Sequence, residues 1–188
     1  GPAMKTLVFC LEEPSAREML KGVLSRFLPE DIKVTYLVFE GKQDLQKQLE
    51  RRLRGWQQPD SHFIVLQDKD SHDCLAVKRK LQDLCDRAGR SEALVRIACH
   101  ELESFYLGDL RAVEKGLCMK GLAVQQRTRK YADPDALANA AEELKKLTQG
   151  RYQKIQGSCL IGRHMDLEGG NSSHSFNVLI KGIRRLVA

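Results

Sequence analysis

Acidic residues stand directly after apolar runs in three places that are far apart in the chain. They form three pairs: Glu12-Glu13, Asp68-x-Asp70 and Glu101-x-Glu103. Carboxylate oxygens are the ligands that the hard cations Mg²⁺ and Mn²⁺ prefer. One such ion, or two about 4 Å apart, can activate water and stabilise the leaving oxygen of a phosphodiester. The pairs therefore predict a divalent-metal site for phosphodiester chemistry, provided that the fold brings them together.

The apolar runs themselves predict an α/β fold. Four of them are short and rich in β-formers, and we expect strands at Lys5–Leu11, Ile32–Phe39, His62–Leu66 and Ala93–Cys99. Helical spacing of apolar residues follows each run, which indicates βαβ units and a mainly parallel, Rossmann-like sheet flanked by helices. Ligands of such sheets gather outside the carboxyl ends of the strands. Three of the four strands end there in acids, so we expect the pairs to converge.

The segments between and after the strands give the rest of the expected architecture. We expect six helices: one beginning at Pro14, one over Asp44–Leu53, one around Val77 and Leu81, one from Leu102 to Val113, one over Pro134–Leu147 and one over Ser173–Val187. We also expect Leu75 to face inward from the third helix and Asp133 to be the N-cap of the fifth. Segment 121–133 is expected to be irregular and segment 150–170 to be loop-rich. We divide the chain into an α/β core, residues 4–116, and a mostly helical extension, residues 117–188, packed on it as one structural unit.

The acids also have a structural explanation. Acidic residues are common where strands pass into helices, because they cap free N–H groups and favour the helix dipole. Asp70 or Ser71 would suit an N-cap, and Glu12 or Glu13 a first helical turn. For any single position this is the simpler interpretation, whereas three aligned strand ends together favour the metal site.

Composition limits the setting in which the protein works. The 188 residues carry a net charge of +6 and the pI is near 9.0, which suits a partner that carries phosphates. The six cysteines are scattered without a C-x-x-C pair, so we expect a reducing compartment and no structural zinc. No stretch approaches the roughly 20 apolar residues of a membrane span, and we expect a soluble, cytoplasmic protein. Neither a Walker A loop nor a GxGxxG motif occurs.

Glu12 and the Asp68-Lys69-Asp70 motif resemble the Toprim fold of topoisomerases, primases and overcoming-lysogenization-defect nucleases. There a glutamate closes the first strand and an Asp-x-Asp closes a later one. The resemblance implies that Glu12 is a general base or metal ligand and that Asp68 and Asp70 are metal ligands. Glu13 stands where the Toprim signature has glycine.

A second resemblance covers nearly the whole chain. The motif at residues 96–109, RIACHELESFYLGD, is similar to the Toprim-related proteins grouped as domain of unknown function 4276, as are Glu12-Glu13-Pro14-Ser15, Gln67-Asp68-Lys69-Asp70 and Ser173-His174-Ser175-Phe176. That family often has tryptophan at the position of Phe105. Its members are often encoded beside an ATPase of the ABC/AAA type. The resemblance implies a nuclease that acts with such an ATPase in bacterial defence against phage or plasmid.

Several basic residues and one histidine are further candidates. His100 adjoins the last acidic pair and is a candidate proton donor, metal ligand or phosphate contact, although histidines at strand ends usually only form hydrogen bonds. Lys154, in the expected loop, could reach the acidic edge and touch phosphate. Arg127, Arg129 and Lys130 could follow a nucleic-acid backbone, although solvated cations are the ordinary interpretation.

The sequence leaves three functions open. The first is a nuclease that uses Mg²⁺ or Mn²⁺, with Glu12, Asp68, Asp70, Glu101 and Glu103 as its catalytic carboxylates and DNA or RNA as substrate. The second is a non-catalytic Toprim-like scaffold, or a nucleic-acid-binding subunit of an ATPase complex. The third, a phosphoacceptor receiver domain, does not need the Glu101-x-Glu103 motif. The expected partners are nucleic acid and the ATPase, and homo-oligomerisation stays open.

Overall fold

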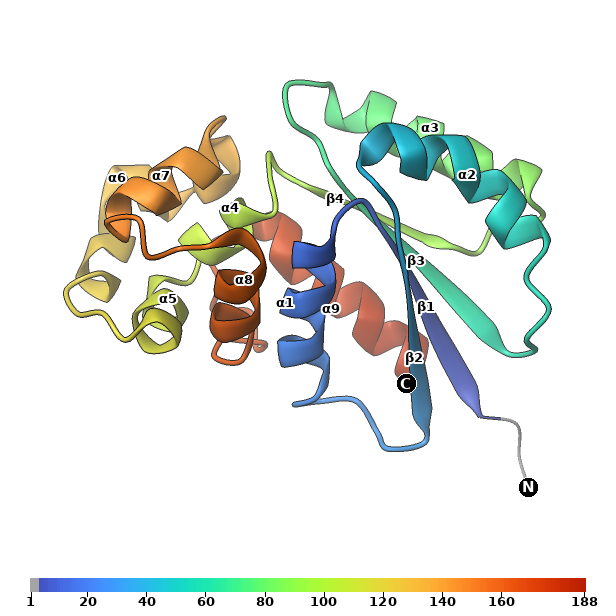
Figure 1. The fold of residues 1–188 in the computed structure, drawn as a ribbon, viewed down its shortest axis with the longest axis horizontal. Helices are drawn as coiled ribbons and strands as arrows, with labels where there is room; N and C mark the ends of the chain where they lie inside the picture. The colour runs from blue at the N-terminus through green and yellow to red at the C-terminus, as the bar shows by residue number, and fades with distance from the viewer. Residues whose placement is uncertain (1–3) are drawn as a thin grey trace.

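A four-stranded parallel sheet forms the centre of the computed structural model, which describes residues 4–188 (Figure 1). Its strands are β1 (Lys5–Leu11), β2 (Ile32–Val38), β3 (Ser61–Asp68) and β4 (Leu94–Ala98). They lie in the order β2-β1-β3-β4, and every neighbouring pair is parallel. The α/β prediction with a mainly parallel, Rossmann-like sheet is confirmed, and each expected strand is found within a few residues of its predicted ends.

Helices connect the strands and make up the segment that follows β4. They are α1 (Pro14–Leu24), α2 (Lys42–Arg54), α3 (Cys74–Arg87), α4 (Glu103–Leu107), α5 (Leu110–Leu117), α6 (Arg129–Ala132), α7 (Ala140–Leu147), α8 (Lys154–Gly162) and α9 (His174–Val187), with 3₁₀ helices η1 (Ala123–Arg127) and η2 (Pro134–Ala136). Helices α2 and α3 cover one face of the sheet, while α1 and α9 lie on the other (Figure 1). None of the helices in residues 4–188 is both long and apolar enough to cross a membrane.

The period of two in the strands divides the core into two layers. In β3, Phe63 and Val65 belong to the core under α2 and α3, whereas Ile64 and Leu66 belong to the larger core under α1, α4, α5, α8 and α9. Both sides of the central strands are therefore buried, as expected for a parallel sheet. The same alternation continues beyond Leu66, so Gln67 faces the side of α2 and α3 while Asp68 faces the opposite side of the sheet.

The strand order creates a switch point between β1 and β3. The chain leaves β1 to form β2 on one side, and later returns to form β3 on the other side of β1. In open parallel sheets ligands bind in the crevice at such a point, outside the carboxyl ends of the strands. The carboxyl end of β1 leads into Glu12, and β3 ends at Asp68.

Four details of the predicted helices were wrong. Leu75 is 68% exposed, because it lies in the first turn of α3 and faces away from Val77 and Leu81. The helix expected from Leu102 to Val113 is broken into α4 and α5, because Asp109 caps a new helix by accepting a hydrogen bond from the Ala112 amide at 3.1 Å.

The other two corrections concern the extension. The helix expected from Pro134 stops after η2 and resumes as α7 at Ala140, and the side chain of Asp133 forms no cap bond. The segment expected to be loop-rich contains α8, whose sequence lacks an amphipathic period and includes glycines at 157 and 162.

Gly162 of α8 and Gly22 of α1 have a packing role, since α8 lies directly against α1. A Cβ atom on Gly162 would stand 2.7 Å from the Met19 carbonyl oxygen, and one on Gly22 would stand 2.8 Å from the Arg163 nitrogen. The close approach holds the end of α8 against α1, and the start of α8 lies beside Glu13 at the carboxyl edge of the sheet. Tyr152 and Lys154 reach the acidic residues from there.

Candidate functional site

Glu12 joins the ends of the two strands at the switch point. Its Oε1 accepts a hydrogen bond from the Asp68 backbone N–H at 2.7 Å. This bond continues the β1–β3 pairing beyond Leu11 and Leu66. Glu12 is 8% exposed. Because one of its oxygens is held by the backbone, the other remains available to a ligand.

Asp70 lies in the turn after β3, beside the turn after β4. The Lys69 amide donates to the Ala98 carbonyl at 3.0 Å, and the Asp70 amide donates to the His100 carbonyl at 2.9 Å. Asp70 has φ of 51°, a left-handed conformation that aspartate tolerates better than most residues. Its carboxylate forms an ion pair with Lys42, the first residue of α2.

Glu103 contributes a fully buried carboxylate. It is 0% exposed, and its Oε2 accepts a hydrogen bond from the Tyr152 hydroxyl at 2.6 Å. Its Oε1 is buried without a hydrogen-bond partner among residues 4–188. A buried carboxylate oxygen without a partner is costly, so this atom is suited to accept a hydrogen bond from a ligand or to bind a cation.

Glu13 repeats this pattern at the end of β1. Its Oε2 pairs with Lys154 Nζ at 3.0 Å, and its Oε1 is buried with no partner in the described part of the chain. Burial works against the charge of Lys154, but Glu13, Glu103 and Asp68 together raise its pKa. The positive charge of Lys154 therefore acts on several carboxylates at once.

Burial and mutual repulsion raise the pKa values of the clustered acids. Burial, followed by the charges of Glu13 and Asp70, raises the pKa of Glu12 to about 7, against the opposing effect of the Asp68 amide. The pKa of Asp68 is raised well above its usual value by burial and then by Glu12, Glu13, Glu103 and Asp70. These side chains are thus close enough to act on one another, and a bound cation would favour their ionised forms.

Glu101 and His100 lie at the rim of the cluster. Burial and then the charge of Glu103 raise the pKa of Glu101, while the Ala141 amide at the start of α7 lowers it. His100 Nε2 lies 3.0 Å from Lys69 Nζ, and its Nδ1 is buried without a partner within residues 4–188.

We define the acidic cluster as Glu12, Glu13, Asp68, Asp70, Glu101 and Glu103. Its donor set, carboxylate oxygens with two of them buried and unpartnered, is chemically suited to a hard divalent cation. In the present side-chain arrangement, however, no three Asp, Glu, His or Cys residues of the described chain are grouped to hold one metal ion. Lys42 and Lys154 supply the positive charge at Asp70 and Glu13.

The basic residues named from the sequence do not all lie near this cluster. Lys154 contacts it directly. Arg127 and Arg129 belong to η1 and α6, and Lys130 pairs with Glu143 of α7 at 2.7 Å. Figure 1 shows α6 at the end of the molecule away from the sheet.

Two residues of the site were missed by sequence reasoning. Lys42 follows the end of β2 and begins α2, so the strand-end rule applied to acids would also have identified this lysine. Tyr152 stands in the segment expected to be a loop, and no local pattern in the sequence connects it with Glu103.

Comparison with protein-family models gives one match, described as a domain of unknown function (DUF4276), over residues 11–184. The chain therefore belongs to this family. The match includes every residue of the acidic cluster together with Lys42, Tyr152 and Lys154. No curated protein and no solved structure matches the chain.

Proposed function

We propose that this member of the DUF4276 family is a divalent-metal-dependent nuclease that cleaves phosphodiester bonds of nucleic acid. The observation that carries the proposal is the convergence of carboxylates that follow β1, β3 and β4 at the carboxyl edge of the sheet. Two of their oxygens, Glu13 Oε1 and Glu103 Oε1, are buried and unpartnered in the described residues. A helix-capping role does not account for Glu12, Glu13 or Asp70. Neither Glu12 nor Glu13 forms a side-chain cap bond to α1, and α3 is capped by Asp73.

Glu12, Asp68 and Asp70 are the residues that would hold Mg²⁺ or Mn²⁺, with Glu13 and Glu103 beside them. When bound, the cation lowers the pKa of a water molecule and stabilises charge on the phosphate oxygens. The raised pKa values of Glu12 and Asp68 fit this role, because a site built for a cation holds its carboxylates too close together in the cation's absence.

The chain's own residues supply the remaining chemistry. The pKa of Glu12 is about 7 in the metal-free chain, and a bound cation would favour its ionised form. Glu12 would then be an ionised carboxylate at neutral pH, suited to hold the metal or to accept a proton from the attacking water. Lys154 and Lys42 stand at the two sides of the cluster and can each turn from their carboxylate partners to a phosphate oxygen. Lys42 and Lys154 thus counter the negative charge of both the cluster and the substrate.

The finer assignment, a Toprim-type nuclease that works with an ABC/AAA-type ATPase in antiphage defence, rests on resemblance. Glu12 after the first strand and Asp68-x-Asp70 after the third support the Toprim part. The cytoplasm is the setting that this proposal requires, and DNA and RNA are both candidate substrates.

A non-catalytic, nucleic-acid-binding subunit is the second candidate function. The ion pairs Lys42–Asp70 and Lys154–Glu13 favour it, because they neutralise two of the carboxylates without a metal. Such a subunit would bind nucleic acid equally well in EDTA and would show no cleavage.

Cleavage of plasmid DNA, single-stranded DNA and RNA in Mn²⁺ or Mg²⁺ tests the proposal, and the assay is repeated with an ABC/AAA-type ATPase if one is found encoded beside this protein. We expect cleavage that EDTA stops and that Asp68→Asn lowers by about 100-fold or more. Asp83→Asn, which removes an exposed carboxylate of α3, is the matched control and should leave the rate unchanged. Cleavage that survives both EDTA and Asp68→Asn would reject this site.

A further inference from the structure

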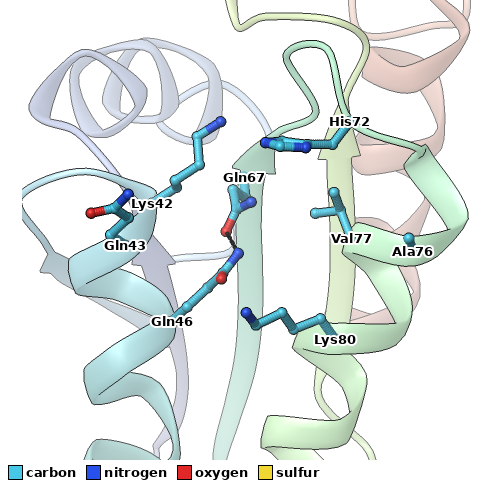
Figure 2. Close-up of a pocket in the computed structure, with 8 residues that line it drawn as sticks. All are labelled: Lys42, Gln43, Gln46, Gln67, His72, Ala76, Val77 and Lys80. Atoms are coloured by element: carbon cyan, nitrogen blue, oxygen red, sulfur yellow. Dashed lines mark hydrogen bonds between the residues drawn. The ribbon is translucent and has the colours of Figure 1, made fainter.

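A pocket of about 380 Å³ lies between the first halves of α2 and α3, on the face of β3 opposite the acidic cluster. Its volume falls within the range of small-molecule sites. The pocket is lined by Lys42, Gln43, Gln46, Gln67, His72, Ala76, Val77 and Lys80 (Figure 2). Its lining contains donors and cations but no carboxylate. We call it the α2–α3 pocket.

Gln67 gives this pocket an unpaired donor at its floor. The side chain is 1% exposed, and its Oε1 accepts a hydrogen bond from Gln46 Nε2 at 3.0 Å. Gln67 Nε2 is buried and has no partner among residues 4–188. Buried amide donors are almost always paired, so this group indicates an acceptor oxygen supplied by a ligand.

The rim of the pocket is positively charged. Figure 2 shows Lys80 reaching from α3 across one end of the pocket, below Gln46, while His72 and Lys42 stand at the other end, above Gln67. Lys80 forms no ion pair within the described chain, so its charge is free to meet an anion. The pocket also lies at the N-terminal halves of two helices of 13 and 14 residues, whose dipoles favour negative charge.

Strand geometry places the α2–α3 pocket next to the acidic cluster. Gln67 and Asp68 are consecutive in β3, and successive side chains of a strand point to opposite faces. Lys42 belongs to both sites, since it lines the pocket and pairs with Asp70. A strand of nucleic acid crossing the carboxyl end of β3 would meet both.

We propose that the α2–α3 pocket binds one nucleotide of the substrate strand, adjacent to the phosphodiester held at the acidic cluster. This inference rests on the proposed nuclease function and names a substrate subsite for it. The nucleotide's phosphate lies by Lys80, and a base carbonyl accepts from Gln67 Nε2. Val77 with the lysine methylenes packs against the base or sugar, while Lys42 and His72 stand at the opposite end of the pocket, where Lys42 pairs with Asp70 of the acidic cluster.

Isothermal titration in EDTA tests the pocket without any metal-dependent step. The probes are thymidine 5′-monophosphate, thymidine and inorganic phosphate, titrated into the wild-type chain, Lys80→Ala and Lys47→Ala. Lys47 is an exposed lysine of α2 outside the pocket and serves as the matched control. We expect the monophosphate to bind more tightly than thymidine or phosphate, and Lys80→Ala to weaken it about tenfold or more while Lys47→Ala does not.

Equal affinity of Lys80→Ala and Lys47→Ala, or inorganic phosphate binding as tightly as the monophosphate, would overturn the inference. Gln67→Met supplies a second variant, which should lower the affinity for thymidine as well as for the monophosphate. Failure of the nuclease proposal would look different, because nucleotide binding in EDTA would be intact while Asp68→Asn left any cleavage unchanged.

Discussion

The two faces of the carboxyl end of β3 are chemically opposite. On one face Asp68 lies among Glu12, Glu13, Asp70 and Glu103, where buried acceptor oxygens outnumber donors. On the other face the neighbouring residue, Gln67, presents a buried donor to a pocket with a cationic rim. The end of β3 thus contributes to two sites: the acidic cluster, which is suited to a cation, and the α2–α3 pocket, which is suited to an anion or a hydrogen-bond acceptor. A metal ion and a nucleotide of the same substrate would satisfy both.

Replacing Glu12 gives the largest expected effect and separates the two faces. In Glu12→Gln the carboxamide cannot take up the proton of water, so we expect Mn²⁺-dependent cleavage to fall by about 100-fold or more at pH ~8. At subsaturating Mn²⁺ the wild-type rate should rise with pH through about 7, because Glu12 must lose its proton before the metal binds, and the variant should lack this rise. Monophosphate binding in EDTA should be unchanged. If Glu12→Gln keeps the wild-type pH profile, the proton of Glu12 does not control cleavage.

The acidic face also predicts how stability depends on pH. The pKa of Glu12 is raised from 4.5 to about 7, first by burial and then by Glu13 and Asp70. The folded chain therefore binds this proton more tightly than the unfolded chain. The proton contributes its full amount to the free energy of unfolding below pH ~4.5, and this contribution is lost as the pH rises through about 7. The raised pKa of Asp68 acts in the same direction.

In EDTA we expect the free energy of unfolding to fall between pH ~5 and ~8, with a contribution on the order of 3 kcal/mol from Glu12. Urea denaturation at several pH values measures it. Glu12→Gln should flatten the curve, and Mn²⁺ at pH ~8 should restore stability to the wild type. A free energy of unfolding that rises between pH ~5 and ~8 in EDTA would contradict the raised pKa values of Glu12 and Asp68.

Removing the Tyr152 hydroxyl tests how the extension supports the acidic face. Tyr152→Phe leaves Glu103 with neither carboxylate oxygen bonded within the described residues, and we expect a loss of about 1–3 kcal/mol in the free energy of unfolding. Tyr36→Phe is the control, since the Tyr36 hydroxyl, on β2, forms no hydrogen bond in the structure as described. Equal stability of the two variants would show that the Tyr152–Glu103 contact is unimportant.

The smallest effect is expected at Lys42, which connects the two faces. Its ion pair with Asp70 is partly exposed, so Lys42→Met should cost roughly 1 kcal/mol or less in unfolding free energy. Lys42 also lowers the pKa of Glu12, and the variant should need a higher pH for activity. Lys47→Met, on the same helix, is the control. If the pH profile of cleavage is the same in Lys42→Met as in the wild type, Lys42 does not act on the acidic cluster.

The comparison of the two faces also shows how far the sequence could predict this molecule. The meeting of Glu12, Asp68, Asp70 and Glu103 at one edge of the sheet was predictable, because parallel strands share one carboxyl edge and apolar runs mark where each strand ends. Gln67 was visible in the same motif, but its importance depends on a pocket between two helices that no local pattern describes. Lys154 was expected to reach the acidic edge from a loop, whereas it begins α8 and Tyr152 stands just before this helix. The glycines of α8 weaken the helical signal in the sequence, although one of them, Gly162, permits the contact with α1.

Binding of Mn²⁺ is the most direct test of the claim that the carboxylates of β1 and β3 share a cation. Titration calorimetry at pH ~8 should detect Mn²⁺ binding to the wild-type chain and to Asp83→Asn, and Asp68→Asn should weaken it by about tenfold or more. The affinity should fall toward pH ~6, because Glu12 must lose its proton to bind the metal. Mn²⁺ binding that is equal in Asp68→Asn and Asp83→Asn, or absent from the wild type, would contradict the account.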